Sequence, residues 1–206
     1  MREEETVKIR SIKPEIRILG IDDGIFVPHT KGLVDVIGVV YRGGYWLDGV
    51  MRTEVEIDGM DATEKIAAMI TNSPHYDQIR VVTLNGITLA GFNVVDIQEL
   101  YKKLRLPVIV VTREKPNLEE IKEALMNLPD HERRWEAVKK AGKIIEVCTR
   151  RAEKPIYMQI AGLSEADAEK ILRKTSTRSN FPEALRVAHI IASGLAQLKE
   201  KESGDI

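Results

Sequence analysis

Residues Leu33 to Tyr41 read LVDVIGVVY, an almost continuous apolar run. Such a run is typical of a strand that is covered on both faces of a sheet. A β-rich segment, Ile16–Ile21, precedes it, and the alternating segment Tyr45–Ile57 follows it after the turn signal Gly43-Gly44. Strands joined by such short links pair in antiparallel fashion. The sequence therefore predicts an antiparallel meander of three strands, the third with one face in water.

The apolar spacing changes to that of alternating helices and strands after Asp61. A strand at Ile79–Leu84, a helix at Asn93–Leu104 and a strand at Leu106–Val111 form a parallel strand–helix–strand unit. Further helices are predicted at 117–128, 131–141, 164–174 and 182–201, and strands at 143–148 and 155–159. A plain doubly wound fold does not open with a meander, whereas the ribonuclease H-type fold does. We expect a single α/β domain over residues 1–206, with a mixed sheet and helices on both faces.

Composition limits the environment and the partners of this chain. The single cysteine, Cys148, excludes an intramolecular disulfide and favours a reducing compartment. No apolar stretch approaches the ~18 residues of a membrane span, so a cytoplasmic location is predicted. The net charge of −1 gives no overall basic surface for nucleic acid. A late stretch is basic and suits either a phosphate-binding surface or a solvated helix face: Arg150, Arg151, Lys154, Lys170, Arg173, Lys174 and Arg178.

Acidic residues lie at two places where they could bind a metal ion or take part in catalysis. Asp22 and Asp23 end the first strand, and adjacent carboxylates repel each other unless a cation or a turn uses them. The following glycine also allows an ordinary Asp-Gly turn. Asp61 and Glu64 have the spacing of a capping box at a helix start, which is the favoured interpretation. Both roles are compatible if Asp61 caps the helix while Glu64 points at a metal.

Two later segments carry candidate binding residues. The loop from Asn85 to Asn93 contains Gly86 and Gly91, which let a ligand approach the backbone ahead of a helix N-terminus. An ordinary strand-to-helix turn explains the same loop. In the last helix, the predicted core stripe is Val187, Ile190, Ile191 and Leu198. Arg186 and His189 share another face and suit phosphate contact and proton transfer, or form a simple surface pair.

Four motifs resemble an archaeal family that is grouped with endonuclease V and called endonuclease dU. They are GIDDG at 20–24, DGMDATEKI at 58–66, NGITLAGFNVVDI at 85–97 and PEALRVAHIIA at 182–192, and the resemblance covers nearly the whole chain. It implies a ribonuclease H-type sheet on which acids hold Mg²⁺ or Mn²⁺ and one strand of nucleic acid is cut beside a deaminated base. By position, Asp22 and Glu64 match the family's acids, Asn85 stands where a second strand-end acid is found, and His189 matches a late histidine.

The resemblance implies roles for individual residues. Asp22, Glu64 and His189 are the expected catalytic residues, and Asp22, Asp23 and Glu64 the expected metal ligands, converging in one cleft. The expected substrate-binding residues are Asp61, Asn85, Gly86, Gly91, Asn93 and Arg186. Two departures stand out: Asn85 is neutral, which weakens a hard-cation site, and the Tyr-Ile-Pro-Gly wedge of endonuclease V has no counterpart before Glu64.

Three functions follow from these features. The leading hypothesis is a magnesium-dependent endonuclease whose partner is nucleic acid, DNA rather than RNA, containing deaminated bases. The alternative is a protein on the same fold that binds nucleic acid or a nucleotide without cutting, which Asn85 and the near-neutral charge favour. The third is a small-molecule enzyme that uses the Gly86–Asn93 loop for a nucleotide phosphate.

Overall fold

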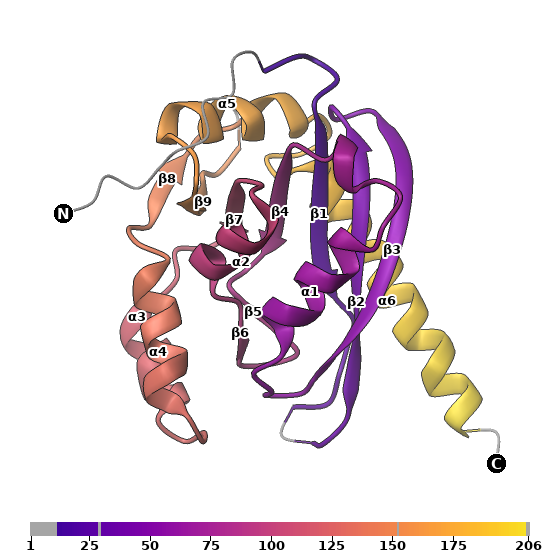
Figure 1. Cartoon of the computed structure of the whole chain (residues 1–206), viewed down its shortest axis with the longest axis vertical. Coiled ribbons are helices and arrows are strands. Elements are labelled where there is room, and N and C mark those ends of the chain that lie inside the picture. The colour runs from indigo at the N-terminus through magenta and orange to yellow at the C-terminus, as the bar shows by residue number, and fades with distance from the viewer. Residues whose placement is uncertain (1–11, 29, 152, 205–206) are drawn as a thin grey trace.

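A seven-stranded mixed sheet forms the centre of the computed structural model, which describes residues 12–28, 30–151 and 153–204 (Figure 1). The strand order is β3-β2-β1-β4-β7-β9-β8. β1, β4 and β7 are parallel to one another, and every other neighbouring pair is antiparallel. The strands are β1 (Arg17–Asp23), β2 (Leu33–Arg42), β3 (Trp46–Glu56), β4 (Val81–Asn85), β7 (Val108–Thr112), β8 (Ile145–Val147) and β9 (Ile156–Ala161).

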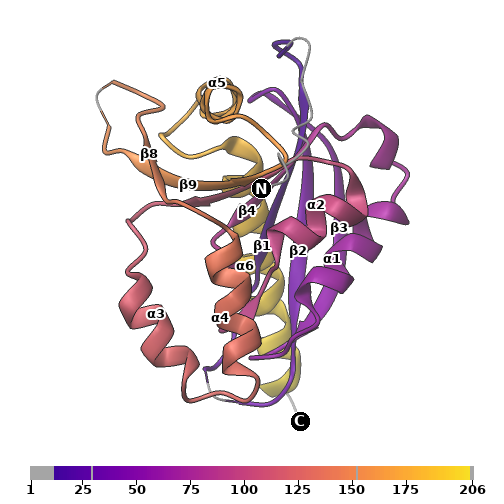
Figure 2. The same cartoon turned by 60° about the vertical axis from the view of Figure 1, so that its left-hand side comes forward.

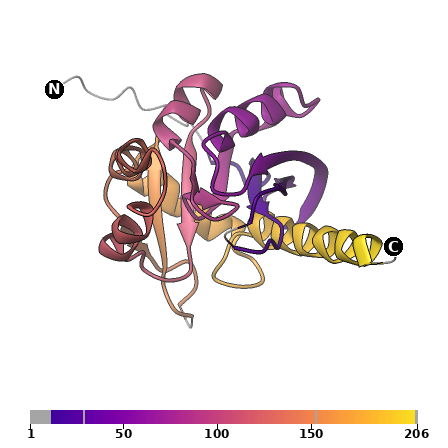
Figure 3. The same cartoon turned by 90° about the horizontal axis from the view of Figure 1, so that it is seen from below.

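The helices divide between the two faces of this sheet, as Figure 3 shows for α1 and α2 on one side and α6 on the other. One face carries α1 (Ala62–Thr71), α2 (Ile97–Leu104), α3 (Leu118–Leu125) and α4 (His131–Lys140), of which α3 and α4 lie side by side (Figure 2). The other face carries α5 (Glu165–Thr175) and α6 (Glu183–Gly204). A short 3₁₀ turn, η1 (Tyr76–Gln78), precedes β4. The predicted meander, the parallel strand–helix–strand unit and the helices on both faces are confirmed.

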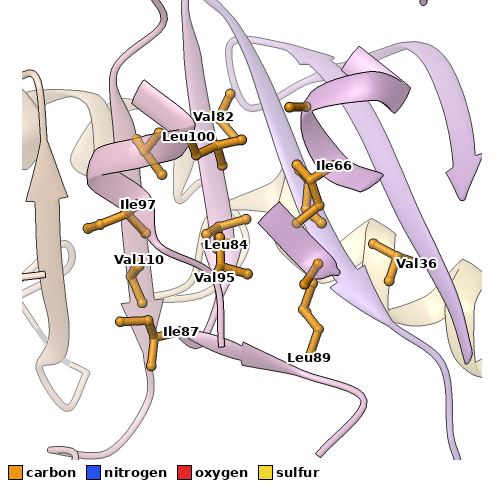
Figure 4. Close-up of a cluster of buried hydrophobic side chains, with 14 of the residues drawn as sticks. Val36, Ile66, Val82, Leu84, Ile87, Leu89, Val95, Ile97, Leu100 and Val110 are labelled. Atoms are coloured by element: carbon orange, nitrogen blue, oxygen red, sulfur yellow. The ribbon is translucent and has the colours of Figure 1, made fainter. Parts of the chain in front are cut away.

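Side chains on the central strands alternate between the two helical layers, because successive residues of a strand point to opposite faces. On β1, Leu19 and Ile21 belong to the cluster under α1 and α2, whereas Ile18 belongs to the cluster under α5 and α6. Figure 4 shows the first cluster, with Ile66 of α1 and Leu100 of α2 packed above the strands. Burying each such large apolar side chain stabilises the fold by roughly 1.5–3 kcal/mol. No helix in the described ranges is long and apolar enough to cross a membrane.

The helix predicted from Asn93 begins four residues later, at Ile97. The carboxylate of Asp96 accepts hydrogen bonds from the backbone N–H groups of Gln98 and Glu99, which fixes the helix start at this position. Asn93–Val94 instead forms β6, which pairs with β5 (Thr88–Leu89) in a two-stranded ribbon. This ribbon lies beside the carboxyl end of β1.

The core stripe predicted for α6 is wrong in part. Ile190 and Leu198 are exposed, and the fully buried stripe consists of Leu185 and the small residues Ala184, Ala188 and Ala192. The reason is close packing of α6 on β1: a Cβ on Gly20 would lie 2.4 Å from the carbonyl carbon of Ala184. Only glycine on the strand and small residues on the helix allow this approach, which brings later residues of α6 over the end of β1.

Candidate functional site

Asp22, the sixth residue of β1, lies at the centre of a polar cluster under α6. Its side chain is 3% exposed, and its Oδ2 atom accepts a 2.9 Å hydrogen bond from Nδ2 of Asn85, at the end of β4. The same oxygen lies 2.9 Å from Nδ1 of His189, on α6. The Oδ1 atom accepts from the backbone N–H of Asp23 at 3.1 Å. Three segments that are distant in sequence therefore meet at one carboxylate.

The carboxylate of Asp22 fixes the orientation of the His189 ring. Burial raises the pKa of Asp22. The hydrogen bond from Asn85 and the interaction with His189 favour the ionised form and lower this pKa, but by less than burial raises it. When Asp22 is ionised, the proton between the two residues belongs on Nδ1, so Nε2 of a neutral His189 carries the free lone pair. Because the His189 side chain is 63% exposed and Nε2 bonds to no described residue, this nitrogen can reach a ligand. The structure therefore brings together Asp22, Asn85 and His189, three of the residues to which the resemblance assigns roles.

Asp23 points to the opposite face of the sheet, toward the β5–β6 ribbon. Its Oδ2 atom accepts a 2.6 Å hydrogen bond from the backbone N–H of Ala90. Burial raises the pKa of Asp23 to about 6, with the nearby charge of Asp22 acting in the same direction and the bond from Ala90 against it. Asp22 and Asp23 are neighbours in sequence, yet their carboxylates have different surroundings and different partners.

The raised pKa of Asp23 makes the stability of the protein depend on pH. Between about pH 4 and pH 6 the folded protein holds a proton that the unfolded chain has released, so the free energy of unfolding falls as the pH rises. Asp23→Asn removes this titration and keeps an oxygen for Ala90. We expect Asp23→Asn to be more stable than the native protein by about 3 kcal/mol at pH 8 and equally stable at pH 4. Thermal melting in a chelator checks this, and an equal difference at both pH values would contradict it.

A network of hydrogen bonds ties the DGMDATEKI and NGITLAGFNVVDI motifs to each other. Oδ1 of Asp58 accepts from the backbone N–H of Phe92, and the side-chain amide of Asn93 donates to Glu56 O and to Oδ1 of Asp61. Oδ1 of Asn93 accepts from the N–H of Ala62. The network holds the ribbon that presents Ala90 to Asp23.

Two of the predicted substrate-binding residues are part of this network. Asn93 is completely buried with its amide fully paired, so it supports the ribbon and presents no polar atom to a substrate. Asp61 makes no side-chain capping bond to α1, so the predicted capping box is wrong; its Oδ1 accepts from Glu56 N–H and Asn93 instead. Asn93, bonded to Ala62 N–H, satisfies the helix start in its place.

Arg134, which the sequence analysis did not select, closes the same network from α4. It is 1% exposed, and its guanidinium donates to four carbonyl oxygens, those of Asp58, Gly59, Phe92 and Pro129, at 2.7–3.1 Å. Desolvation lowers the pKa of Arg134, while the nearby negative charges of Asp58 and Asp130 act in the opposite direction and raise it. A signal existed in the sequence: Arg134 shares a helical stripe with Ala137, Val138 and Ala141, all buried.

Glu64 does not join Asp22, which corrects the prediction of one shared acidic cleft. It lies on α1, on the other face of the sheet, with a 62% exposed side chain whose carboxylate is 2.8 Å from Nζ of Lys103. It lines a pocket of about 440 Å³ together with Asp96 and Glu99 of the α2 start and residues of α4. The physical reason is the position of α1, which covers the opposite side of the sheet from α6.

The remaining predicted residues lie around the cluster. Arg186, one turn before His189, is held by the buried carboxylate of Glu183 through Nε at 3.0 Å and Nη2 at 2.7 Å. It therefore offers a substrate fewer donors than the prediction assumed. Gly86 begins the loop after Asn85, and its N–H donates to Val111 O. Gly91 has a φ of +86°, and a Cβ there would lie 2.3 Å from Oδ1 of Asp58, so its place in the ribbon requires glycine.

The side chains around Asp22 could hold a magnesium ion only if water and substrate supplied most of its ligands. No group of three or more His, Cys, Asp or Glu side chains among the described residues could hold a metal. Mg²⁺ nevertheless is commonly held by one or two carboxylates together with water and substrate phosphates. Asp22 supplies one carboxylate, and within the part of the chain that the structure describes its Oδ1 accepts only the backbone N–H of Asp23.

Comparison with known proteins places the chain in a family. Residues 14–196 match the endonuclease dU family. A UPF0215 protein of Methanosarcina acetivorans is 55% identical over 184 residues, which cover 89% of this chain and 92% of the relative. The crystal structure of a protein of unknown function from Archaeoglobus fulgidus is similar with a TM-score of 0.77 and 42% identity, over 87% of this chain and 97% of that one.

A more distant similarity concerns the fold alone. Endonuclease V of Ciona intestinalis, solved in complex with a 24mer DNA containing an inosine followed by a ribo-adenosine, has a TM-score of 0.59 at 14% identity, over 90% of this chain and 87% of that one. The mixed sheet and its helices are therefore arranged as in endonuclease V. With nearly its whole length matched, the chain belongs to the endonuclease dU family.

Proposed function

We propose that the protein is a magnesium-dependent endonuclease that hydrolyses a phosphodiester bond in DNA containing a deaminated base. The observation that carries the proposal is the meeting of Asp22, Asn85 and His189 at the carboxyl ends of the central parallel strands. The family and the endonuclease V-like fold support a nuclease role. The order β3-β2-β1-β4-β7, with its antiparallel meander, supports assignment to the ribonuclease H-type folds, and the single cysteine supports a cytoplasmic location.

The reaction would depend on Asp22 through two of its contacts. Asp22 Oδ1 would take part in holding Mg²⁺, which when bound supplies a more acidic water and neutralises charge on the phosphodiester oxygens. Asp22 Oδ2 keeps His189 in the tautomer with a proton on Nδ1. Nε2 of His189 then accepts a proton from the attacking water or returns one to the leaving oxygen. Asn85 holds Asp22 in place by its 2.9 Å hydrogen bond.

The test is cleavage of labelled duplexes that differ only in one base. We expect a single nick near deoxyuridine or deoxyinosine in the presence of Mg²⁺ or Mn²⁺, no nick in a chelator, and little cleavage of the matched normal duplex. An RNA duplex with inosine, run beside the DNA, measures which nucleic acid is preferred. Equal cleavage of the normal duplex would contradict the proposed base specificity, and cleavage in the chelator would contradict the proposed metal dependence.

Asn85→Asp should make the stability of the protein depend on the metal. Without metal, the new carboxylate faces Asp22 Oδ2 where an amide donor was, and we expect a loss of about 1–3 kcal/mol in the free energy of unfolding. With Mg²⁺ or Mn²⁺, the extra anionic ligand should reverse this loss and raise any nuclease activity. Melting curves with and without metal measure the effect, and Asn127→Asp, at an exposed position after α3, is the control. A metal-independent melting temperature in Asn85→Asp would contradict the placement of the ion.

A second function is favoured by one observation. Asn85 donates a hydrogen bond from its amide to Asp22, whereas an acid at position 85 would repel Asp22. The site is therefore stable without any cation. A protein that binds deaminated nucleic acid without cutting it would use such a site. Tight binding of the deoxyinosine duplex together with no cleavage in Mg²⁺ or Mn²⁺ would favour this function.

A further inference from the structure

A pocket of about 420 Å³ lies at the other end of the sheet from Asp22. Figure 1 shows α5 and the β2–β3 turn at this end of the molecule, opposite the β5–β6 ribbon. The strand register separates the two places: Asp22 pairs with Ile37, and Arg17 with Arg42, five residues farther along. At ~3.3 Å per residue this is roughly 17 Å along the strands. The residues lining the pocket are Pro14, Tyr45, Arg173, Lys174, Ser176 and Thr177.

One wall of the pocket is aromatic and open to solvent. Tyr45 is 67% exposed, and its ring centroid lies 5.4 Å from that of Trp46, which is itself 49% exposed. The guanidinium of Arg42 lies over the Trp46 ring, 5.3 Å from its centroid. Exposed, adjacent aromatic rings of this kind are unusual on a surface that binds nothing.

The opposite wall carries cations and an unpaired hydroxyl. Arg173 and Lys174 are exposed, and each has donors left over after its contacts with Glu169 and Ile12 O. Ser176 is 5% exposed, and its Oγ atom is buried with no hydrogen-bond partner among the residues described. A buried hydroxyl without a partner costs free energy, so contact with a ligand requires the Ser176 side chain to turn toward the pocket and then relieves this cost. The two cations also suit the carboxyl end of α5, but that role explains neither the hydroxyl nor the aromatic wall.

The pocket is built rigidly between two chain segments. Oγ1 of Thr177 donates to Gly44 O at 2.7 Å, which joins the segment after α5 to the β2–β3 turn. The Arg150 guanidinium donates to Thr177 O from a third segment. Such bonds hold the walls in place before any ligand arrives, which lowers the entropy lost on binding.

We propose that this pocket binds one nucleotide of a substrate strand, with the base stacked on Tyr45 and the phosphate beside Arg173 and Lys174. Stacking on an aromatic ring next to cations is the way in which single strands are held without regard to sequence. An acidic peptide would use the cations and leave the aromatic wall without a role. The proposal rests on the proposed function in taking nucleic acid as the ligand. At 3.4 Å per stacked nucleotide, the pocket lies about five nucleotides from Asp22.

Binding of a labelled single-stranded 20-mer with a central deoxyuridine, measured by fluorescence anisotropy in a chelator, tests the proposal. We expect Tyr45→Ala to weaken binding roughly 5- to 100-fold and Tyr45→Phe to leave it unchanged, because phenylalanine keeps the ring. Arg173→Ala should weaken binding and reduce the slope of log affinity against log salt by about 0.7, the value for one phosphate contact on a single strand. Lys103→Ala, which removes an ion-paired lysine on the other face, should change neither quantity.

The outcomes separate this proposal from the proposed function. In Mg²⁺, Tyr45→Ala should cut a substrate with ~2 flanking nucleotides at the native rate, but it should cut a 20-mer less efficiently than the native protein does. The reason is that only the longer strand spans the ~17 Å between Asp22 and the pocket. Native binding of the 20-mer by Tyr45→Ala would overturn the pocket proposal and leave the nuclease proposal standing. Failure of the native protein to bind any oligonucleotide would overturn both. Loss of polyglutamate binding in Arg173→Ala, with oligonucleotide binding unchanged in both Tyr45→Ala and Arg173→Ala, would assign the pocket to an acidic polypeptide and overturn the proposal as well.

Discussion

Asp22→Ala should lower metal-dependent cleavage of a deoxyuridine or deoxyinosine duplex by roughly 10³-fold or more. The change removes a carboxylate that would help to hold the ion and, at the same time, the group that orients His189. The fold should be nearly unaffected, because burial already opposes the charge of Asp22 and its loss relieves repulsion with Asp23. Single-turnover cleavage together with thermal melting measures both effects.

A matched control separates the loss of this carboxylate from a general loss of negative charge. Asp77 is exposed on η1, just before β4 begins, and Asp77→Ala should cleave at the native rate. Asp22→Asn is a second variant: it keeps the volume and a hydrogen-bonding oxygen but removes the charge, so activity should fall nearly as far as in Asp22→Ala. Native cleavage by a folded Asp22→Ala would remove Asp22 from the active site.

Arg134→Ala should destabilise the protein by about 3–5 kcal/mol, the largest stability effect expected of a single polar residue in this fold. The change leaves a cavity and deprives four carbonyl oxygens of their donors at once. A loss of this size corresponds to a fall of roughly 6–20 °C in Tm, at ~2–4 °C per kcal/mol. Chemical denaturation and thermal melting measure it.

The neighbouring residue provides the control for this prediction. Arg133 has the same charge and the same helix but is exposed, so Arg133→Ala should change stability by no more than ~0.5 kcal/mol. Equal stability of the two variants would mean that the four carbonyls find other partners, most directly water. In that case the ribbon beside Asp23 does not depend on Arg134.

Most of the fold could be predicted because its elements follow the periodicity of their own side chains. The apolar run of β2 and the Gly43-Gly44 turn are enough to predict the meander from the sequence. The exceptions were set by contacts between distant residues. α2 begins at Ile97 because Asp96 caps it, and α6 buries alanines because Gly20 lets the helix approach the strand. A stripe of small residues has no strong hydrophobic signal, so the larger Ile190 and Leu198 were chosen instead.

The candidate site could be predicted only in part. Asp22, Asn85 and His189 are all residues to which the motif resemblance assigns roles, and their side chains meet where β1 and β4 end beside α6. The alternation of side chains along β1 already implied that Asp22 and Asp23 point to opposite faces, but the paired acids were treated as one cluster. Glu64 was misplaced because its direction depends on how α1 packs, which no local pattern contains.

Asn93 and Asp61 were misassigned for a different reason. Their residue types suit a ligand as well as they suit a loop, and only the hydrogen bonds to Glu56 and Ala62 reveal that they hold two motifs together. Arg134 was missed because an arginine in a charged helix is usually solvated, although its place on the apolar stripe indicated burial. Much of the motif resemblance therefore lies in residues that support the site and do not touch a substrate.

The position of a bound Mn²⁺ ion would show whether the carboxylate of Asp22 holds the metal. Crystals grown with a deoxyinosine oligonucleotide and soaked in Mn²⁺ would locate the ion by its anomalous scattering. We expect a peak within about 2.5 Å of a carboxylate oxygen of Asp22, with a substrate phosphate as a further ligand. A peak at Glu64 with none at Asp22, or an oligonucleotide bound across Asp22 without an ion, would contradict this expectation.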